Sequence, residues 1–347
     1  MAERFPEEVV MEILSRLPVK PLLRFRCVSK SWFRLLTMDS HFIKLHLNQL
    51  IQANPMPMIM YLREHRSRST HFHLAEDYTA CNKAIELDVL PFNMEKLHRK
   101  YLVSGICNGL LCLSDYFFEE YSKVYIWNPL TKDHIIIPCS PIPSHTIDDW
   151  WTLYSFGYHQ VTNEFKVIRI MCTTKHAYTN EKFQSHVSVY TLGTGSWRII
   201  EPMSYDILLT IHYPALVNGA LHWLAARPGS TSWNLIVSFD LKDEVFREIP
   251  LPREYGVIGS WSIQYKIGQP NGHQSSFRLE PLGVASSGEI VVRADTRRLI
   301  VYSPKTNSVK RLKKFAFQSY HVYAYIGSIV SPRLINATSH IIDTEES

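Results

Sequence analysis

The residues from Phe5 to Leu36 read FPEEVVMEILSRLPVKPLLRFRCVSKSWFRLL, and their pattern predicts short helices. Pro6 suits the first helical position, because its missing N–H would have no partner there. Glu7 and Glu8 add negative charge to the first turn, where it complements the helix dipole. Pro18 ends this helix. Before it, apolar residues recur at helical spacing: Val9, Val10, Ile13, Leu14 and Leu17.

Two or three more short helices are expected before residue 50. Pro21 can begin the second, Trp32 lies in a third, and a fourth can start near Asp39 or Ser40. So small a bundle buries little core and is marginal by itself. It also has more apolar positions than it can hide, which indicates a surface for a partner. A bundle with a purely internal core and no partner is the alternative.

The same stretch closely resembles an F-box, the adaptor-binding module of SCF-type ubiquitin ligases. The resemblance rests on Phe5-Pro6, Glu12-Ile13-Leu14, Leu17-Pro18, Leu22-Leu23, Arg24 to Val28 and Lys30-Ser31-Trp32. Phe5 stands where many members have leucine. The resemblance implies that a Skp-type adaptor packs against the proline-bearing turns and apolar helix faces. The residues expected to bind it are Pro6, Ile13, Leu14, Leu17, Pro18, Leu22, Phe25, Val28 and Trp32.

Beyond residue 50 the pattern changes to short apolar runs separated by turn residues, which predicts many short strands. One unit recurs, namely a strand ending in an aromatic residue, a polar turn and a second apolar strand. It occurs as VYIWNPLTKDHIIIP (124–138), VSVYTLGTGSWRIIEP (187–202), IVSFDLKDEVFREIPLP (236–252) and LIVYSPKTNSVKRLKKF (299–315).

A second hairpin precedes three of these units, in GICNGLLCL (105–113), LVNGALHWL (216–224) and VASSGEIVV (284–292). The Asn-Gly pairs in the first two are strong hairpin signals. YSFGYHQVTNEFKVIRI (154–170) fills the same place with a longer turn. Two hairpins give about four strands, which is one blade of a β-propeller. We therefore predict an all-β domain, and favour a β-propeller of about five to seven blades over a β-sandwich.

This region also resembles the F-box-associated, or kelch-like, domain that follows the F-box in a large plant family. The similar segments are GICNGLLCL, WNPLTK, FGYHQVTNEFKVI, NGALHWL and YHVYAYIGSIVSP. The resemblance implies a scaffold that recognises protein targets. Short strands near both ends of the region, MIMYL (58–62) and YHVYAYI (320–326), predict that the propeller is closed by pairing of its ends.

These patterns divide the chain into three parts. Residues 1–50 form the helical F-box, residues 51–335 the propeller-like domain, and residues 336–347 a disordered tail. The N-terminus has early acids rather than the basic and apolar segments of a signal peptide, and no apolar run approaches the length of a membrane helix. We expect a cytoplasmic or nuclear protein that does not bind membranes.

Signatures of catalysis are not found in the sequence, which contains no HExxH, GxSxG, Walker or dinucleotide motif. Ser286-Ser287-Gly288 fits a hairpin turn better than a nucleophile. His71 and His73 fit a surface pair better than a metal site, because no third ligand has suitable spacing. Cys107 and Cys112 are expected to be small buried apolar residues. We predict no enzyme activity, no catalytic residue, no metal and no cofactor.

Two surfaces could bind a target. Aromatic residues near Pro- and Gly-containing stretches, Trp150, Trp151 and Trp233, are candidates because large aromatics often anchor interfaces. They could instead fill cores between blades. The basic hairpin at 297–314 could contact an acidic or nucleic-acid partner, but a solvated outer face is favoured and nucleic acid is not expected.

These inferences together predict the substrate-recognition subunit of an SCF-type E3 ubiquitin ligase. The F-box would bind the Skp-type adaptor, and through it a cullin and a RING subunit, while the β domain would hold a protein target. The alternatives are a propeller binding module outside any ligase, or a nucleic-acid binder that uses residues 297–314.

Overall fold

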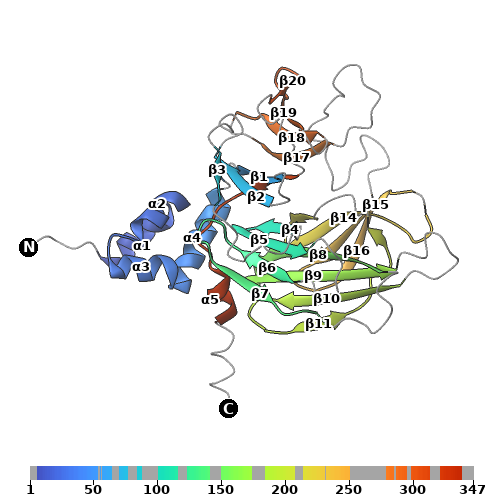
Figure 1. Ribbon diagram of the computed structural model, residues 1–347, viewed down its shortest axis with the longest axis horizontal. Coiled ribbons are helices and arrows are strands. Elements are labelled where there is room, and N and C mark those ends of the chain that lie inside the picture. Colours follow the sequence, from blue (N-terminus) through green and yellow to red (C-terminus); the bar gives the residue numbers. More distant parts are fainter. Residues whose placement is uncertain are drawn as a thin grey trace, which may run out of the picture. The chain divides into compact units, whose positions relative to one another are not determined.

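The structure is a computed structural model of the chain (Figure 1). It describes residues 6–53, 55, 57–64, 70–76, 84–87, 101–115, 123–140, 150–173, 184–207, 214–230, 232–250, 279–284, 287–294, 298–312 and 321–337. Helices lie at the N-terminal end of this chain, and strands make up most of the rest, as the sequence predicts.

Four helices open the chain: α1 (Glu7–Ser15), α2 (Val19–Phe25), α3 (Lys30–Thr37) and α4 (Ser40–Ala53). Polar side chains fix the starts of the last two. The Ser29 hydroxyl accepts a hydrogen bond from the N–H of Trp32 at 3.1 Å, and Asp39 accepts one from the N–H of Phe42 at 2.9 Å. Such caps satisfy backbone donors that have no partner inside the helix.

The strands that the structure describes form five antiparallel sheets. The first contains β1 (Met58–Glu64), β2 (Thr70–Ala75), β3 (Ile85–Glu86) and β21 (His321–Tyr325). The second contains β4 (Tyr101–Cys107), β5 (Leu110–Asp115), β6 (Val124–Trp127) and β7 (His134–Ile137). The third contains β8 (Trp150–His159), β9 (Glu164–Thr173), β10 (Ser185–Thr191) and β11 (Trp197–Ile200).

The last two sheets follow the same plan. The fourth contains β12 (Asp206–Ile207), β13 (Ala215–Val217), β14 (Ala220–Ala226), β15 (Leu235–Asp240) and β16 (Phe246–Pro250). The fifth contains β17 (Leu279–Val284), β18 (Ile290–Ala294), β19 (Arg298–Ser303) and β20 (Ser308–Arg311). Each predicted pair of hairpins therefore forms one sheet, and the fold is a five-bladed β-propeller rather than a sandwich.

The first blade combines strands from both ends of the propeller sequence. β1 pairs with β21, so that Met60 lies opposite Tyr323. This pairing confirms the predicted meeting of MIMYL with YHVYAYI. Closure of this kind gives an otherwise exposed strand edge a partner.

The Asn-Gly hairpins form as predicted. Asn108 and Gly109 have φ angles of 50° and 79°, and Asn218 and Gly219 have φ angles of 50° and 73°. Two consecutive residues with positive φ are typical of the type I′ turn that joins twisted strands.

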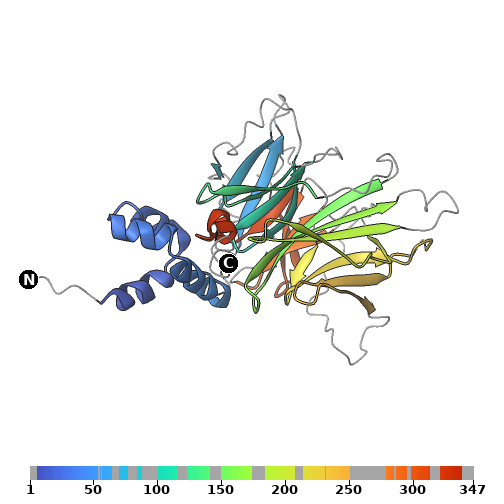
Figure 2. The same cartoon turned by 90° about the horizontal axis from the view of Figure 1, so that it is seen from below.

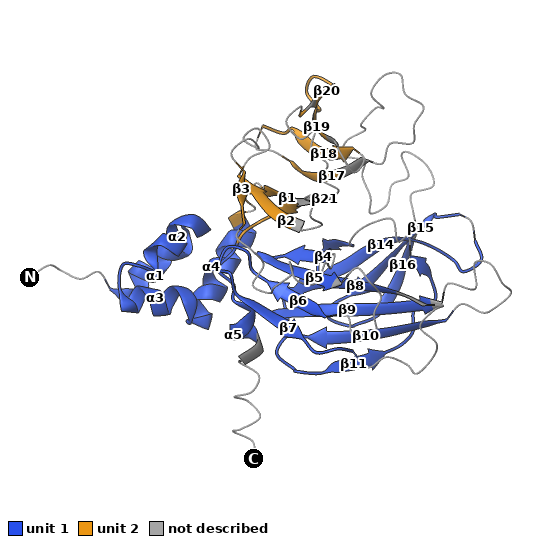
Figure 3. Cartoon of the chain, in the orientation of Figure 1, with its two compact units in different colours: residues 1–52, 99–251, 328–347 blue, residues 53–98, 252–327 orange. Residues whose placement is uncertain are grey.

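The chain divides into two compact units, drawn in different colours in Figure 3. Unit 1 comprises residues 1–52, 99–251 and 328–347, and unit 2 comprises residues 53–98 and 252–327. The predicted helical domain is thus not a compact unit by itself. One buried cluster runs from Leu14, Leu22 and Phe42 of the helices to Leu110 and Ile126 of the second blade.

A fifth helix, α5 (Pro332–Ala337), belongs to unit 1 and contacts β7. Figures 1 and 2 place it at the end of unit 1 that carries α1 to α4. It includes Asn336 and Ala337, the first two residues of the segment expected to be a disordered tail. The rest of that segment, 338–347, lies outside the described residues.

Candidate partner-binding site

The residues expected to bind an adaptor fall into three groups by burial. Leu14 and Leu22 are 2% and 0% exposed, so they hold the helices together rather than face a partner. Leu17, Phe25 and Trp32 are half-buried. The rings of Phe25 and Trp32 meet edge to face, with centroids 5.5 Å apart.

The third group is exposed. Pro6 and Pro18 lie at the starts of α1 and α2, while Ile13 is 56% exposed and Val28 is 61% exposed. Three further exposed apolar residues of this region were not predicted: Val9, Phe33 and Met38. Helical spacing could have found Val9, because it lies four residues before Ile13 on the same helix face.

A buried histidine supports the turn between α1 and α2. The Nε2 atom of His46 in α4 hydrogen-bonds the carbonyl oxygen of Leu17 at 3.0 Å. Burial lowers the pKa of His46, although this hydrogen bond opposes the shift. A neutral imidazole beneath the turn positions Leu17 and Pro18, so His46 supports the exposed surface without being part of it.

Unit 1 also fixes the helices to its strands. Arg26, just after α2, is half-buried, and burial lowers its pKa while the nearby Asp133 of the β6–β7 turn raises it. Leu334 and Ile335 of α5 pack on the same buried cluster as the helices. The exposed surface of these helices is therefore carried on a buried core that it shares with the strands of unit 1.

Asn128, the asparagine of WNPLTK, ties the C-terminal segment to the second blade. Its side-chain amide donates to the carbonyl oxygens of Ser328 at 3.0 Å and Val330 at 2.8 Å. Its side-chain oxygen accepts from the N–H groups of Leu130 and Thr131 at 3.0 and 3.3 Å. Asn128 is fully buried, and these four bonds use its whole hydrogen-bonding capacity.

The tight turns of unit 1 share one end of the strands, which we call the helix end. The Ser328 hydroxyl donates to the carbonyl oxygen of Asn108, and His159 of the β8–β9 turn contacts Gly219 of the β13–β14 turn. Arg333, in α5, donates from Nε to the carbonyl oxygen of His134 at 3.3 Å. The helices and the C-terminal segment thus occupy this end.

The opposite end of the same strands, the loop end, carries the tryptophans proposed for target binding. Trp150 and Trp151 begin β8, which runs from there to His159 at the helix end, so these two belong to a strand rather than to a loop. Trp233 lies between β14 and β15 and is 41% exposed. Of these three side chains, the structure describes only that of Trp233.

Other candidates for chemistry are placed as follows. Cys107 and Cys112 are buried, and burial raises the pKa of both thiols. The Nδ1 atom of His71 lies 2.6 Å from a carboxylate oxygen of Glu86, and the ring of His73 stacks on that of Tyr61.

Within the described ranges, no group of three or more His, Cys, Asp or Glu residues could hold a metal ion. Gly288 lies in the β17–β18 turn with φ of 84°.

The basic hairpin is described in part. Lys305 and Lys310 are exposed in β19–β20 and its turn, whereas Arg297, Lys313 and Lys314 lie outside the described residues. Among the helices that the structure describes, none is both long and apolar enough to cross a bilayer.

Two family models match the chain. The F-box domain matches residues 3–44, and the F-box associated beta propeller domain matches residues 58–268, more than half of the chain. The first match lies within residues 1–50, which were predicted to be helical, and the second lies within residues 51–335, which were predicted to form a propeller.

The chain is also similar to proteins of Arabidopsis thaliana whose names include the F-box. F-box protein At3g07870 is 25% identical over 94% of this chain and 92% of its own length. F-box protein CPR1 is 30% identical over 77% of this chain, which spans 64% of that relative. F-box/kelch-repeat protein At3g23880 is 27% identical over 71% of this chain and 65% of its own length.

Proposed function

Because the chain belongs to the F-box proteins that carry an F-box associated β-propeller domain, we propose that it is the substrate-recognition subunit of an SCF-type ubiquitin ligase. In this role α1 to α3 bind a Skp-type adaptor, which connects the chain to a cullin and a RING subunit. The propeller holds a protein target. The chain itself performs no chemistry, and it acts in the cytoplasm or nucleus.

The exposed apolar residues of α1 to α3 and of the turns next to them carry this proposal. Val9, Ile13, Val28, Phe33 and Met38 are each at least 42% exposed, although all lie in the first 38 residues. Scattered exposed apolar residues are ordinary, but a concentration of them on a small module marks an interaction surface. Binding an adaptor would remove these side chains from water and satisfy the surplus of apolar surface.

The arrangement of unit 1 suggests where a target binds. The helices and α5 occupy the helix end, so the loop end, with the exposed Trp233, is left for a target. A rigid link between the two ends would hold the target at a defined distance from the adaptor. Transfer of ubiquitin then depends on proximity, because the scaffold raises the local concentration of the target.

Binding of a purified Skp-type adaptor to the full-length chain tests the proposal. The double variant Ile13→Ser, Val28→Ser should weaken adaptor binding at least tenfold in calorimetric titration, since it removes two exposed apolar contacts of about 1 kcal/mol or more each. The matched control is Val161→Ser, Ile199→Ser, which alters residues that are 83% and 71% exposed on the third blade. Equal affinities of the two variants would contradict the assignment.

A further inference from the structure

Arg169 is a buried cation in the third blade. Its residue is 6% exposed, and it lies on β9 between Tyr154 of β8 and Ser188 of β10, its cross-strand neighbours. Its Nε atom has no hydrogen-bond partner among the described residues. Burial lowers its pKa, while Tyr154 and Cys139 oppose the shift.

The same strand shows how a buried cation is normally accommodated. Lys166, three residues earlier, is 4% exposed and donates to the carbonyl oxygen of Leu241 at 2.6 Å and to Glu244 at 2.9 Å. It also lies 3.2 Å from Glu164. In the described part of the chain, no carboxylate comes this close to the guanidinium of Arg169, although an unpaired buried charge is costly.

The surroundings of Arg169 can donate hydrogen bonds. Its guanidinium lies 6.0 Å from the centre of the Tyr154 ring, and burial raises the pKa of this tyrosine, so its hydroxyl keeps its proton. The hydroxyls of Ser188 and Ser140 are 3.0 Å apart and complete the polar lining. Cations and hydroxyls without carboxylates form a suitable environment for an anion.

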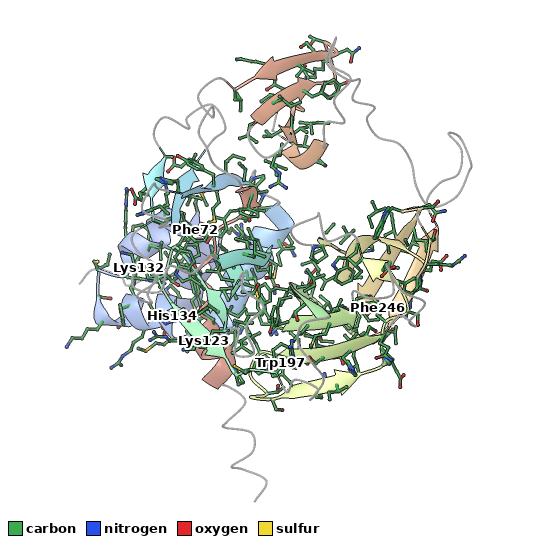
Figure 4. The ribbon with its side chains drawn as sticks, turned by 45° about the vertical axis from the view of Figure 1, so that its right-hand side comes forward. Phe72, Lys123, Lys132, His134, Trp197 and Phe246 are labelled. Carbon is green, nitrogen blue, oxygen red and sulfur yellow. The ribbon has the colours of Figure 1, made fainter. Side chains whose placement is uncertain are left out.

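The site lies close to the surface at the junction of the second and third blades. Residues 138–140, which follow β7 of the second blade, contact strands of the third blade. Trp197 of β11 donates a hydrogen bond from Nε1 to the carbonyl oxygen of Pro138 at 2.7 Å. Figure 4 shows Trp197 between the two sheets. Cys139, in the same segment, is exposed, so solvent reaches the chain one residue before Ser140.

We propose that this junction binds a carboxylate-bearing ligand and that Arg169 is its anchor. A guanidinium presents two parallel N–H groups that match the two oxygens of a carboxylate. The Tyr154 hydroxyl adds a donor, and so does whichever of the Ser140 and Ser188 hydroxyls accepts the bond between them, because that hydroxyl keeps its own proton free. The inference is independent of the proposed ligase function, because it concerns binding to the isolated chain.

Thermal melting of the full-length chain with sodium glutamate, compared with sodium chloride at equal ionic strength, tests this site. The wild type should show a saturable rise of the melting temperature, about 4 °C or more at a hundredfold excess over Kd. Arg169→Met should remove the rise, and Arg169→Lys should reduce it, because lysine keeps the charge but loses the paired donors. Arg24→Met, at an exposed position of α2, is the control and should behave as wild type.

Two further results bear on the proposal. Without glutamate, Arg169→Met should melt no lower than wild type, since it removes an unpaired buried charge. A peptide with one glutamate in a Gly-Ser frame shows the source of the carboxylate: tighter binding than free glutamate indicates a side chain of a protein, and weaker binding a small metabolite. A rise of equal size in wild type and Arg169→Met, no rise at all, or a marked loss of stability in Arg169→Met without glutamate would overturn the proposal.

Discussion

At the scale of single residues, the contacts of unit 1 explain why Gly and Asn occupy the turns. Gly109 has positive φ, and a Cβ atom there would lie 2.3 Å from the Ser328 hydroxyl. Gly229 has almost the same φ, 78°, but a Cβ atom there would meet nothing. Both glycines are needed for their positive φ, but only Gly109 is also needed because there is no space for a side chain.

Replacing each glycine with alanine measures the difference. Both variants should lose about 1 kcal/mol, because alanine is disfavoured at positive φ. Gly109→Ala should lose a further 1–3 kcal/mol or so, since Ser328 and its backbone would have to move. The free energy of unfolding from chemical denaturation checks this expectation. Equal losses would show that the C-terminal segment does not press on the turn.

Asn128 offers a second test of the same attachment. Asn128→Ala leaves two buried carbonyl oxygens and two turn N–H groups without their partner, and should cost about 3 kcal/mol. Asn234→Ala, at an exposed position, should change stability by less than about 0.5 kcal/mol. Melting temperatures of the two variants give the comparison, and a small effect at Asn128 would contradict its role as the tie to residues 328–330.

The sequence predicts the turn at Asn108-Gly109 but not the hydrogen bonds of Asn128. The turn can be predicted locally, because the positive φ angles that it needs are adopted readily by Asn and Gly themselves. The bonds of Asn128 join residues 200 positions apart, and no local pattern encodes such a contact. The motifs WNPLTK and YHVYAYIGSIVSP are each visible in the sequence, yet only the structure shows that they meet.

At the scale of elements, a charge network joins two neighbouring blades of unit 1. Glu244, in the β15–β16 turn, binds Lys166 of β9 and, with both oxygens, Arg198 of β11 at 2.9 and 2.7 Å. Burial would raise the pKa of Glu244, but the hydrogen bonds from Arg198 and Lys166 hold it below its ordinary value. The carboxylate is thus favoured in the folded state.

The direction of this shift predicts a loss of stability in acid. A lowered pKa in the folded state stabilises the fold above the unfolded pKa, near 4.5, and the contribution disappears as pH falls through the folded value. From pH 7 to 3.5, Glu244→Gln should therefore lose less of its melting temperature than wild type loses. Glu201→Gln, at an exposed position, should follow wild type. Identical pH profiles for Glu244→Gln and wild type would show that Glu244 does not contribute to the loss of stability in acid.

The sequence predicts the helices but not which of their faces is exposed. Their existence and approximate bounds follow from proline positions and apolar spacing. Their exposed faces cannot be read in the same way. Leu14 and Ile13 are both apolar residues of α1, yet the first is 2% exposed and the second 56%. Packing of α1 on the other helices decides which apolar residue remains available for an adaptor.

At the scale of the whole molecule, the C-terminal residues complete structure that begins far earlier. β21 supplies the partner of β1 in unit 2, and residues 328–330 bind Asn128 in unit 1. A chain ending at residue 319 loses both attachments. It should be insoluble or melt without cooperativity, because the edge of β1 loses its partner. A soluble truncated chain with a sharp calorimetric transition would show that these residues are dispensable.

The closed propeller could be predicted from repeated hairpins and matching terminal strands, whereas the blade count could not. Uneven spacing between repeats left five to seven blades open, and pairing of β21 with β1 reduces the strands near both ends to one shared blade. The union of the helices with part of the propeller in unit 1 was also not predictable, since it depends on a buried cluster whose members come from the helices and from distant strands.

We propose that one chain holds an adaptor and a target through separate surfaces. Affinity purification of tagged full-length chain under proteasome inhibition, with adaptor and co-purified proteins quantified by mass spectrometry, tests it most directly. We expect that the Ile13→Ser, Val28→Ser variant loses the adaptor but keeps the target, and that the Trp233→Ala variant loses the target but keeps the adaptor. Loss of both partners in either folded variant, or of neither in both, would contradict it.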